Sequence, residues 1–135
     1  MSNWYGAARS NYVRIKDMDA LKAAIDGISI TTQIDDDGRV AFFGDDNDSG
    51  GWPMIEDEDG NVEPIDWSAV VCPHLVEGEI LVIMEVGFER LRYLTGEALA
   101  YNHEGRVHQV NLNQIYTQAA KAFNVPVGSI SEAKY

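Results

Sequence analysis

Alternating polar and apolar residues predict β-strands in the first third of the chain. In Ser10–Lys16, Val13 and Ile15 alternate with polar neighbours, which is the period-two pattern of a half-buried strand. Ser29–Ile34 and Arg39–Phe43 are predicted to pair as a hairpin. The four residues between them end in glycine, which tolerates the positive φ of a tight turn.

The second half of the chain predicts three further strands in succession. Glu79–Val86 is an almost continuous apolar run, which is typical of a central strand. Arg90–Asn102 and Arg106–Leu112 follow it and are separated by a turn sequence. Gly96 lies in the middle of the long second strand, where a glycine suggests a bulge or bend.

Helices are predicted where apolar residues recur every three to four positions. A helix over 17–27 begins at Asp17, a favourable N-cap residue. A helix over 113–123 has the clearest apolar stripe in the chain. Between them, Asp66–Leu75 has helical spacing, but a proline within it should keep the helix short.

These elements predict an α+β fold, an antiparallel sheet of five or six strands with helices packed on one face. Residues 1–135 fit a single domain with an acidic, loop-rich insertion at about 44–64, where glycine and proline are frequent. The strand over 79–86 is apolar on both faces, so a homodimer through the face without helices is expected. The predicted core consists of Val13, Ile15, Leu21, Ile25, Phe42, Leu81, Ile83, Leu91, Leu99, Val110, Ile115, Ala119 and Phe123.

The negative charge of the chain is concentrated in one segment. The whole chain carries 22 acidic and 10 basic residues, a net charge of −12. Residues 35–66 hold twelve of the acids and a single base, so the remainder is nearly neutral. Such a segment must be solvated, because unpaired carboxylates are not buried. It is either a solubilising surface or a recognition surface.

Composition excludes several classes of protein. A hydrophobic content of 45% excludes a disordered chain, and no apolar run approaches the ~20 residues of a membrane helix. A chain this acidic is not expected to bind nucleic acid directly. The N-terminus lacks an apolar signal core and Cys72 is the single cysteine, which together favour a reducing cytoplasm.

Two metal sites are conceivable from residue spacing. The first is a calcium loop, in which positions 1, 3, 5, 6 and 12 of an EF-hand would be Asp45, Asn47, Ser49, Gly50 and Glu56. No flanking helices are predicted, so a plain acidic loop is the preferred interpretation. The second is a transition-metal site, which lacks the paired spacing of zinc motifs and would use Cys72, His74, His103 and His108.

No motif indicates catalysis. Cys72 lies in an apolar run and is expected to be a buried, inert thiol. Solvated carboxylates in 35–66 would keep ordinary pKa values and make poor general acids. Trp52, between a glycine and a proline, is either a pin that anchors its loop on the core or an anchor for a partner, and the pin is preferred. We therefore expect a non-enzymatic protein without a cofactor.

Three segments of the chain resemble small uncharacterised proteins encoded by plasmids, integrative elements and phages of Gram-negative bacteria. The segments are SNYVRIKD, GDDNDSGGWP and HLVEGEILVIMEVGFERLRYLTGEALAYN. The resemblance implies a bacterial cytoplasm and a mobile-element setting, and it transfers no functional residue. Such elements often encode small acidic proteins that block host defence or neutralise a toxin.

Charge and resemblance together lead to one hypothesis with two alternatives. The acidic segment would face a basic partner as a duplex presents its phosphates, so the first hypothesis is a nucleic-acid mimic that inhibits a DNA- or RNA-binding defence protein. The alternatives are a toxin-neutralising immunity protein, and an ion- or small-ligand-binding domain or enzyme that uses the 44–60 loop. The predicted partner-binding residues are Asp35, Asp36, Asp37, Asp45, Asp46, Asp48, Trp52, Glu56, Asp57, Glu58 and Asp59.

Overall fold

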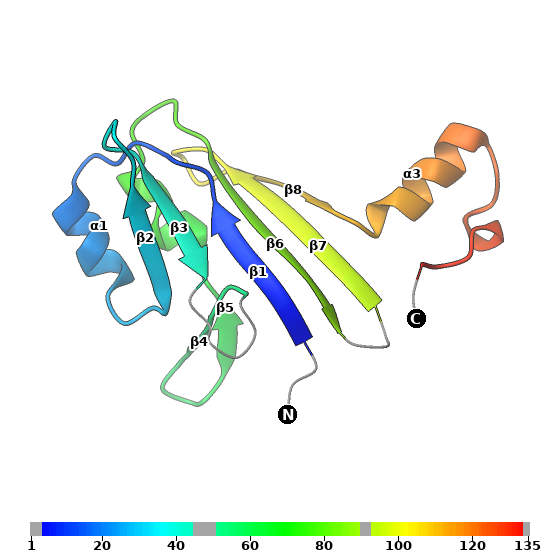
Figure 1. The fold of residues 1–135 in the computed structure, drawn as a ribbon, viewed down its shortest axis with the longest axis horizontal. Helices are drawn as coiled ribbons and strands as arrows, with labels where there is room; N and C mark the ends of the chain where they lie inside the picture. Colours follow the sequence, from blue (N-terminus) through cyan, green and yellow to red (C-terminus); the bar gives the residue numbers. More distant parts are fainter. Residues whose placement is uncertain (1–3, 45–50, 90–92, 134–135) are drawn as a thin grey trace.

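The computed structural model describes residues 4–44, 51–89 and 93–133 and has an α+β fold (Figure 1). Its strands are β1 (Trp4–Ser10), β2 (Ile30–Ile34), β3 (Val40–Gly44), β4 (Met54–Glu56), β5 (Val62–Pro64), β6 (Leu81–Glu89), β7 (Tyr93–Tyr101) and β8 (Val107–Asn111). Its helices are α1 (Met18–Ile25), α2 (Trp67–Val70) and α3 (Gln114–Phe123), with 3-10 turns η1 (Cys72–His74) and η2 (Val127–Ser129).

Six of the strands form one antiparallel sheet in the order β2-β3-β1-β6-β7-β8, and β4 and β5 form a separate hairpin. This confirms the predicted fold class and upper strand number. The hairpin of β2 and β3 and the meander of β6, β7 and β8 also lie where the sequence predicts them. Strands β6 and β7 pair residue by residue without interruption, from Leu81 opposite Tyr101 to Glu89 opposite Tyr93. The bulge expected at Gly96 is therefore absent from this pairing, and the side chain of Leu112 instead covers that glycine.

The first strand lies earlier in the chain than its alternation pattern predicts. β1 ends at Ser10, and the residues after it contribute only isolated bridges, from Val13 to Val40 and from Ile15 to Leu75. Val13 and Ile15 alternate with polar neighbours because they face the core from a segment that crosses the end of the sheet. β1 itself carries no such alternation, so its sequence did not reveal it.

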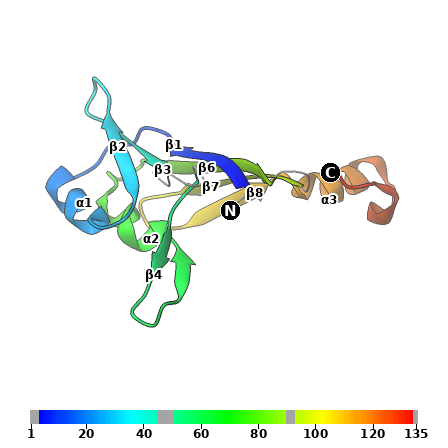
Figure 2. The same ribbon diagram turned by 60° about the horizontal axis from the view of Figure 1, so that its bottom comes forward.

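Helix α1, helix α2 and the β4–β5 hairpin lie on the same side of the large sheet (Figure 2). The Asp17 carboxylate caps α1, accepting hydrogen bonds from the backbone N–H groups of Asp19 and Ala20. The core lies between these elements and the sheet. It is built from Val13, Leu21, Val40, Phe42, Ile65, Trp67, Val71, Cys72, Leu75, Leu81, Ile83 and Tyr101, with Ile15, Ile25 and Leu99 partly buried at its margin.

Helix α3 does not pack on the sheet, and the corresponding core predictions are wrong. Phe123 is 75% exposed and Ile115 is 58% exposed, and Val110 of β8 is also exposed. Ala119 is half-buried, whereas Leu91 lies outside the described residues. Figure 1 shows the reason: α3 continues in the direction of β8 and stands beyond the end of the sheet.

Candidate binding pocket

A pocket of about 290 Å³ lies between the β4–β5 hairpin and the sheet face that carries the core. Three aromatic side chains and two carboxylates line it and define what we call the aromatic–acidic pocket: Trp52, Trp67, Tyr101, Glu85 and Glu97. Its volume is at the lower end of the range for small-ligand sites, about 300–1,000 Å³. The pocket therefore suits one side-chain head group better than an extended cofactor.

The aromatic wall is held by edge-to-face packing. The ring centroids of Trp52 and Trp67 are 4.8 Å apart with an interplanar angle of 73°, and Trp67 makes a second such contact with Phe42 at 5.8 Å. Trp67 is buried, so the wall is continuous with the core. Trp52 thus anchors its segment on the body of the protein, as preferred from the sequence, and it also presents a ring to the pocket.

The two carboxylates come from adjacent strands. Glu85 of β6 and Glu97 of β7 are directly opposite one another in the antiparallel register, which places both side chains on the same face of the sheet. Glu85 accepts a hydrogen bond of 2.7 Å from the backbone N–H of Trp52. Like charges in opposed positions destabilise a sheet. A cation bound between the two carboxylates would remove that repulsion.

Two lining residues add uncharged polar groups to the pocket, the hydroxyl of Tyr101 and the indole N–H of Trp52. Burial raises the pKa of Tyr101 above its ordinary value, and Cys72, Asp66 and Glu97 add to this effect through their charge. The hydroxyl of Tyr101 therefore stays protonated. The indole Nε1 of Trp52 is buried without a hydrogen-bond partner among the described residues.

Some of the acidic residues predicted to bind a partner instead build turns. Asp35 accepts hydrogen bonds from the backbone N–H groups of Asp37 and Arg39, and Asp57 accepts the equivalent pair from Asp59 and Asn61. Asn102 forms the same arrangement without a charge. In each turn the fourth residue is a glycine with φ near +80°, as the sequence predicted for the first of them.

Arg39 further ties Asp35 to its turn. Its guanidinium Nε lies 2.9 Å from the Asp35 carboxylate. Burial acts to raise the pKa of Asp35, but the hydrogen bonds and the charge of Arg39 outweigh it and hold that pKa below its ordinary value. Asp35 is thus engaged within its own turn.

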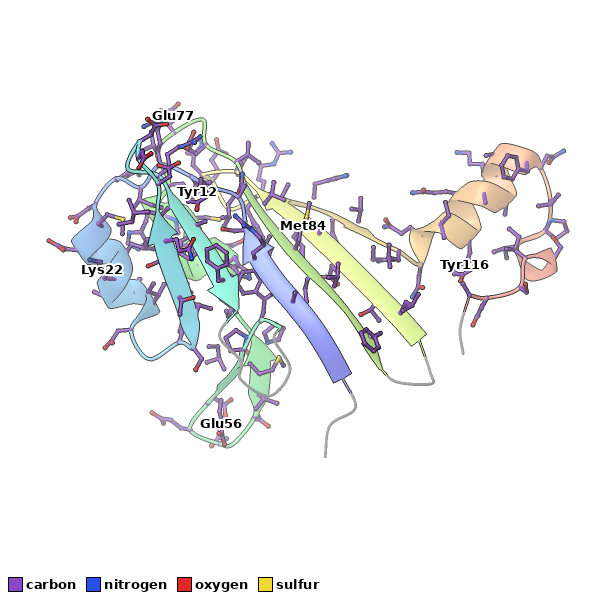
Figure 3. All side chains as sticks on the ribbon, viewed as in Figure 1. Tyr12, Lys22, Glu56, Glu77, Met84 and Tyr116 are labelled. Carbon is purple, nitrogen blue, oxygen red and sulfur yellow. The ribbon has the colours of Figure 1, made fainter. Side chains whose placement is uncertain are left out.

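The remaining predicted acids are exposed but do not form one surface. Asp36 and Asp37 lie in the turn between β2 and β3, whereas Glu58 and Asp59 lie in the turn of the β4–β5 hairpin. These two turns point to opposite sides of the molecule in Figures 1 and 2. Glu56, labelled in Figure 3, projects from the hairpin, away from the large sheet. Asp45, Asp46 and Asp48 lie outside the described residues.

Neither metal prediction gains support from the described residues. Of the calcium loop only Glu56 is described, because Asp45, Asn47, Ser49 and Gly50 lie outside. Within the described part of the chain, no group of three or more His, Cys, Asp and Glu side chains could hold a metal ion.

Cys72 has the character expected of a core thiol. Its side chain is buried, and burial raises the pKa of the thiol to about 11, with the charge of Asp66 adding to the shift. At neutral pH it is therefore neither a thiolate nucleophile nor a ready metal ligand. His74 lies in η1 together with Cys72. The other two histidines of the predicted site lie elsewhere: His103 Nε2 is 3.9 Å from Glu104 Oε1 in a turn, and His108 is exposed on β8.

Glu85, Glu97 and Tyr101 line the pocket but are not predicted as site residues from the sequence. One feature of the sequence could have identified Glu85 as a site residue: it is a carboxylate that interrupts the otherwise apolar run of the most apolar strand. The opposition of Glu85 and Glu97 depends on strand register, which the sequence did not provide.

The chain matches no protein-family model, and neither a curated protein nor a solved structure is significantly similar to it. Among the described residues, no helix has the length and apolar character needed to cross a membrane.

Proposed function

We propose that the protein is a non-enzymatic binding protein that recognises a basic partner by taking a lysine or arginine side chain into the aromatic–acidic pocket. The observation that carries the proposal is the opposition of Glu85 and Glu97 beside Trp52, Trp67 and Tyr101. Carboxylates supply the charge for a cation, and aromatic rings attract it through their faces.

The hairpin beside the pocket extends the acidic surface. Met54 and Pro64, at the base of the hairpin, line the pocket. The hairpin carries five acidic residues and no basic one between them. Its field would favour approach of a positively charged surface and make association dependent on ionic strength.

Two classes of partner have this chemistry. Nucleic-acid-binding proteins carry lysine and arginine aimed at phosphates, so a defence protein of this class would fit, with the acidic hairpin standing in for part of a phosphate backbone. A basic toxin would fit equally. Because the two described acidic turns face opposite ways, the surface that we propose is limited to the pocket and the β4–β5 hairpin.

A peptide titration tests the pocket without knowledge of the partner. The probe is an arginine–glycine repeat peptide, with a lysine–glycine peptide as a second cation and free arginine as a small-ligand control. Binding is followed by tryptophan fluorescence, because Trp52 and Trp67 line the pocket. We expect Glu97→Gln to weaken peptide binding at least tenfold, since it removes one of the two opposed carboxylate charges that line the pocket.

The matched control is Asp36→Asn, which removes the same charge from the distant β2–β3 turn. It should change affinity less than twofold. Glu97→Gln should not lower the melting temperature, because it relieves the repulsion with Glu85. Equal losses for both variants, or no fluorescence change with either peptide, would show that the pocket is not the recognition site. Tight binding of free arginine would instead favour a small-ligand protein.

A further inference from the structure

None of the described helices or hairpins covers one face of the large sheet, and this face is largely apolar over β6 and β7. The side chains on it alternate with those that face the core, and they include Met84 and Val86 of β6, which are 52% and 55% exposed, and Leu94 of β7. Figure 2 shows α1, α2 and the β4–β5 hairpin on the opposite side of the sheet, and Met84 projects from the bare side in Figure 3. A large apolar surface of this kind marks a site of association.

A groove crosses this face. It has a volume of about 480 Å³, and its floor and rims come from Gly6, Ala7, Val86, Gly87, Phe88, Leu94, Thr95 and Leu112. Small residues form part of the groove and large apolar residues flank them. Such a shape receives an apolar side chain or helix from another molecule.

Helix α3 carries an apolar stripe that does not pack on the large sheet. Ile115, Ala119 and Phe123 recur at i, i+4 and i+8, which places them along one stripe. The Tyr116 side of the helix contacts its own C-terminal segment, because the Tyr116 hydroxyl accepts a hydrogen bond from the backbone N–H of Ala133 (Figure 3). A helix of ten residues is marginal by itself in water, so its stripe requires packing against something else.

The helix is held away from its own sheet. The backbone N–H of Leu112 donates to the carbonyl of Gly96, which ties the start of the connection to β7. Asn111 and Gln114 each accept a hydrogen bond from the backbone N–H of the other, as in a capping box. These bonds order the connection between β8 and α3, and α3 continues in the direction of β8 (Figure 1).

The total surface area supports association. The chain exposes 9223 Å², whereas a compact monomer of its 15.0 kDa would expose about 7,000 Å². The excess of about 2,000 Å² is more than the ~800 Å² that each partner buries in a standard interface.

The distribution of charge favours a second copy of this chain as the occupant. Two chains of net charge −12 repel each other, but residues 105–131, which include α3, contain no acidic residue and two basic ones. On the same face of β6, Val82, Met84 and Val86 present no carboxylate either, and Arg9 of β1 lies on this face opposite Met84. Although the chain as a whole is acidic, α3 and this face of β6 lack the negative charge that would oppose self-association.

We propose that α3 of one copy packs across the bare face of β6 and β7 of a second copy, and that the exchange is reciprocal. The dimer is two-fold symmetric, so the same contact occurs twice. It leaves the aromatic–acidic pocket open on the other face, and it is therefore independent of the proposed function.

Sedimentation of the full chain tests the proposal. We expect the wild-type protein to sediment at twice 15.0 kDa. Ile115→Asp places a charge in the apolar stripe of α3, and Met84→Asp places a charge on the apolar face of β6. Each variant should raise the dissociation constant of the dimer at least a hundredfold. Gln118→Asp, which adds the same charge to the exposed polar side of α3, should remain dimeric. Circular dichroism checks that each variant is folded.

Mixing the two defective variants identifies the geometry. An Ile115→Asp chain has an intact face and a Met84→Asp chain has an intact helix, so their mixture retains one of the two contacts and should form heterodimers. A face-to-face dimer would tolerate Ile115→Asp, and a helix-to-helix dimer would tolerate Met84→Asp. The proposal is overturned if the wild-type protein is a monomer, or if either the Ile115→Asp or the Met84→Asp variant remains dimeric. It is also overturned if the two folded variants stay monomeric when they are mixed.

Discussion

Acidic residues in this chain have two different roles, and the local bonds of each carboxylate distinguish them. Asp35 and Asp57 stand at the start of turns and bind backbone N–H groups. Asn102 builds the same turn with an amide, so the geometry needs an oxygen acceptor and not a charge. The side chain of Glu97, in contrast, makes no hydrogen bond or ion pair with the described residues and faces a second carboxylate. Charge density along the sequence therefore overstates the number of acids free to meet a partner.

The charge of Asp35 should matter for stability only where it is ionised. Its pKa in the folded protein lies below the ordinary 3.8, so the ionised carboxylate stabilises the fold above pH 3.8, and that contribution is lost as pH falls below it. Asp35→Asn keeps an acceptor for the turn but loses the ion pair with Arg39. We expect the variant to be less stable than the parent at pH 7, with the difference shrinking as pH falls through 3.8. Urea unfolding at several pH values measures this.

Asp36→Asn serves as the control for the pH series. Asp36 is exposed in the same turn. The difference in the free energy of unfolding between Asp36→Asn and the parent protein should therefore not shrink comparably as pH falls. A difference for Asp35→Asn that stayed constant from pH 7 to pH 3 would contradict the assigned role of the charge.

At the scale of elements, short-range bonds account for where α1 and α3 begin. Asp17 caps α1, whereas α3 starts with the reciprocal pair of Asn111 and Gln114. The two helices nevertheless have different surroundings. Leu21 of α1 is buried in the core, while α3 has no buried residue. The same amphipathic pattern thus predicts a helix but does not tell which surface the helix covers.

The cap of α1 allows a direct test at this scale. Asp17→Ala removes the acceptor for the backbone N–H groups of Asp19 and Ala20 and should lower the free energy of unfolding by about 1 kcal/mol. Chemical denaturation measures it. Asp26→Ala, at the other end of the helix, removes an acid from the negative pole and should leave stability unchanged or raise it slightly. Equal destabilisation by both variants would argue against the cap.

At the scale of the molecule, the two faces of the large sheet differ in what they can bind. The core face carries α1, α2 and the hairpin and ends in the aromatic–acidic pocket. The other face is largely apolar over β6 and β7 and is not covered by any described helix or hairpin, and α3 stands beyond the end of the sheet. A cationic partner and a second copy of the chain would therefore occupy opposite faces. Each chain of the proposed dimer would keep a pocket, so a multivalent basic partner would gain from avidity.

Association of this kind couples folding to protein concentration. If α3 gains its packing from a second copy, the melting temperature of the wild-type protein should rise as its concentration is raised, because dimerisation stabilises only the folded state. Ile115→Asp should show a lower melting temperature that does not change with concentration. Differential scanning calorimetry over a hundredfold concentration range measures both. A wild-type melting temperature that is independent of concentration would contradict the coupling.

Features that depend on a few neighbouring residues can be predicted from the amino-acid sequence alone. The hairpin of β2 and β3, helix α1, the apolar strand β6 and the α+β class follow from local periodicity and from turn and cap chemistry. These signals act over spans of a few residues, so they survive without knowledge of the fold.

How distant segments meet follows from tertiary packing and strand register, which local patterns do not contain. The position of β1 depends on its pairing with β6, more than seventy residues away, and not on its own alternation. Glu85 and Glu97 face one another because the register of β6 and β7 places them so, and Trp52 reaches them from a third segment. Helix α3 continues in the direction of β8 and does not turn back onto the sheet, which its amphipathic pattern does not reveal. Long-range register is set by the packing of the whole sheet, so a local pattern predicts an element but not its neighbours.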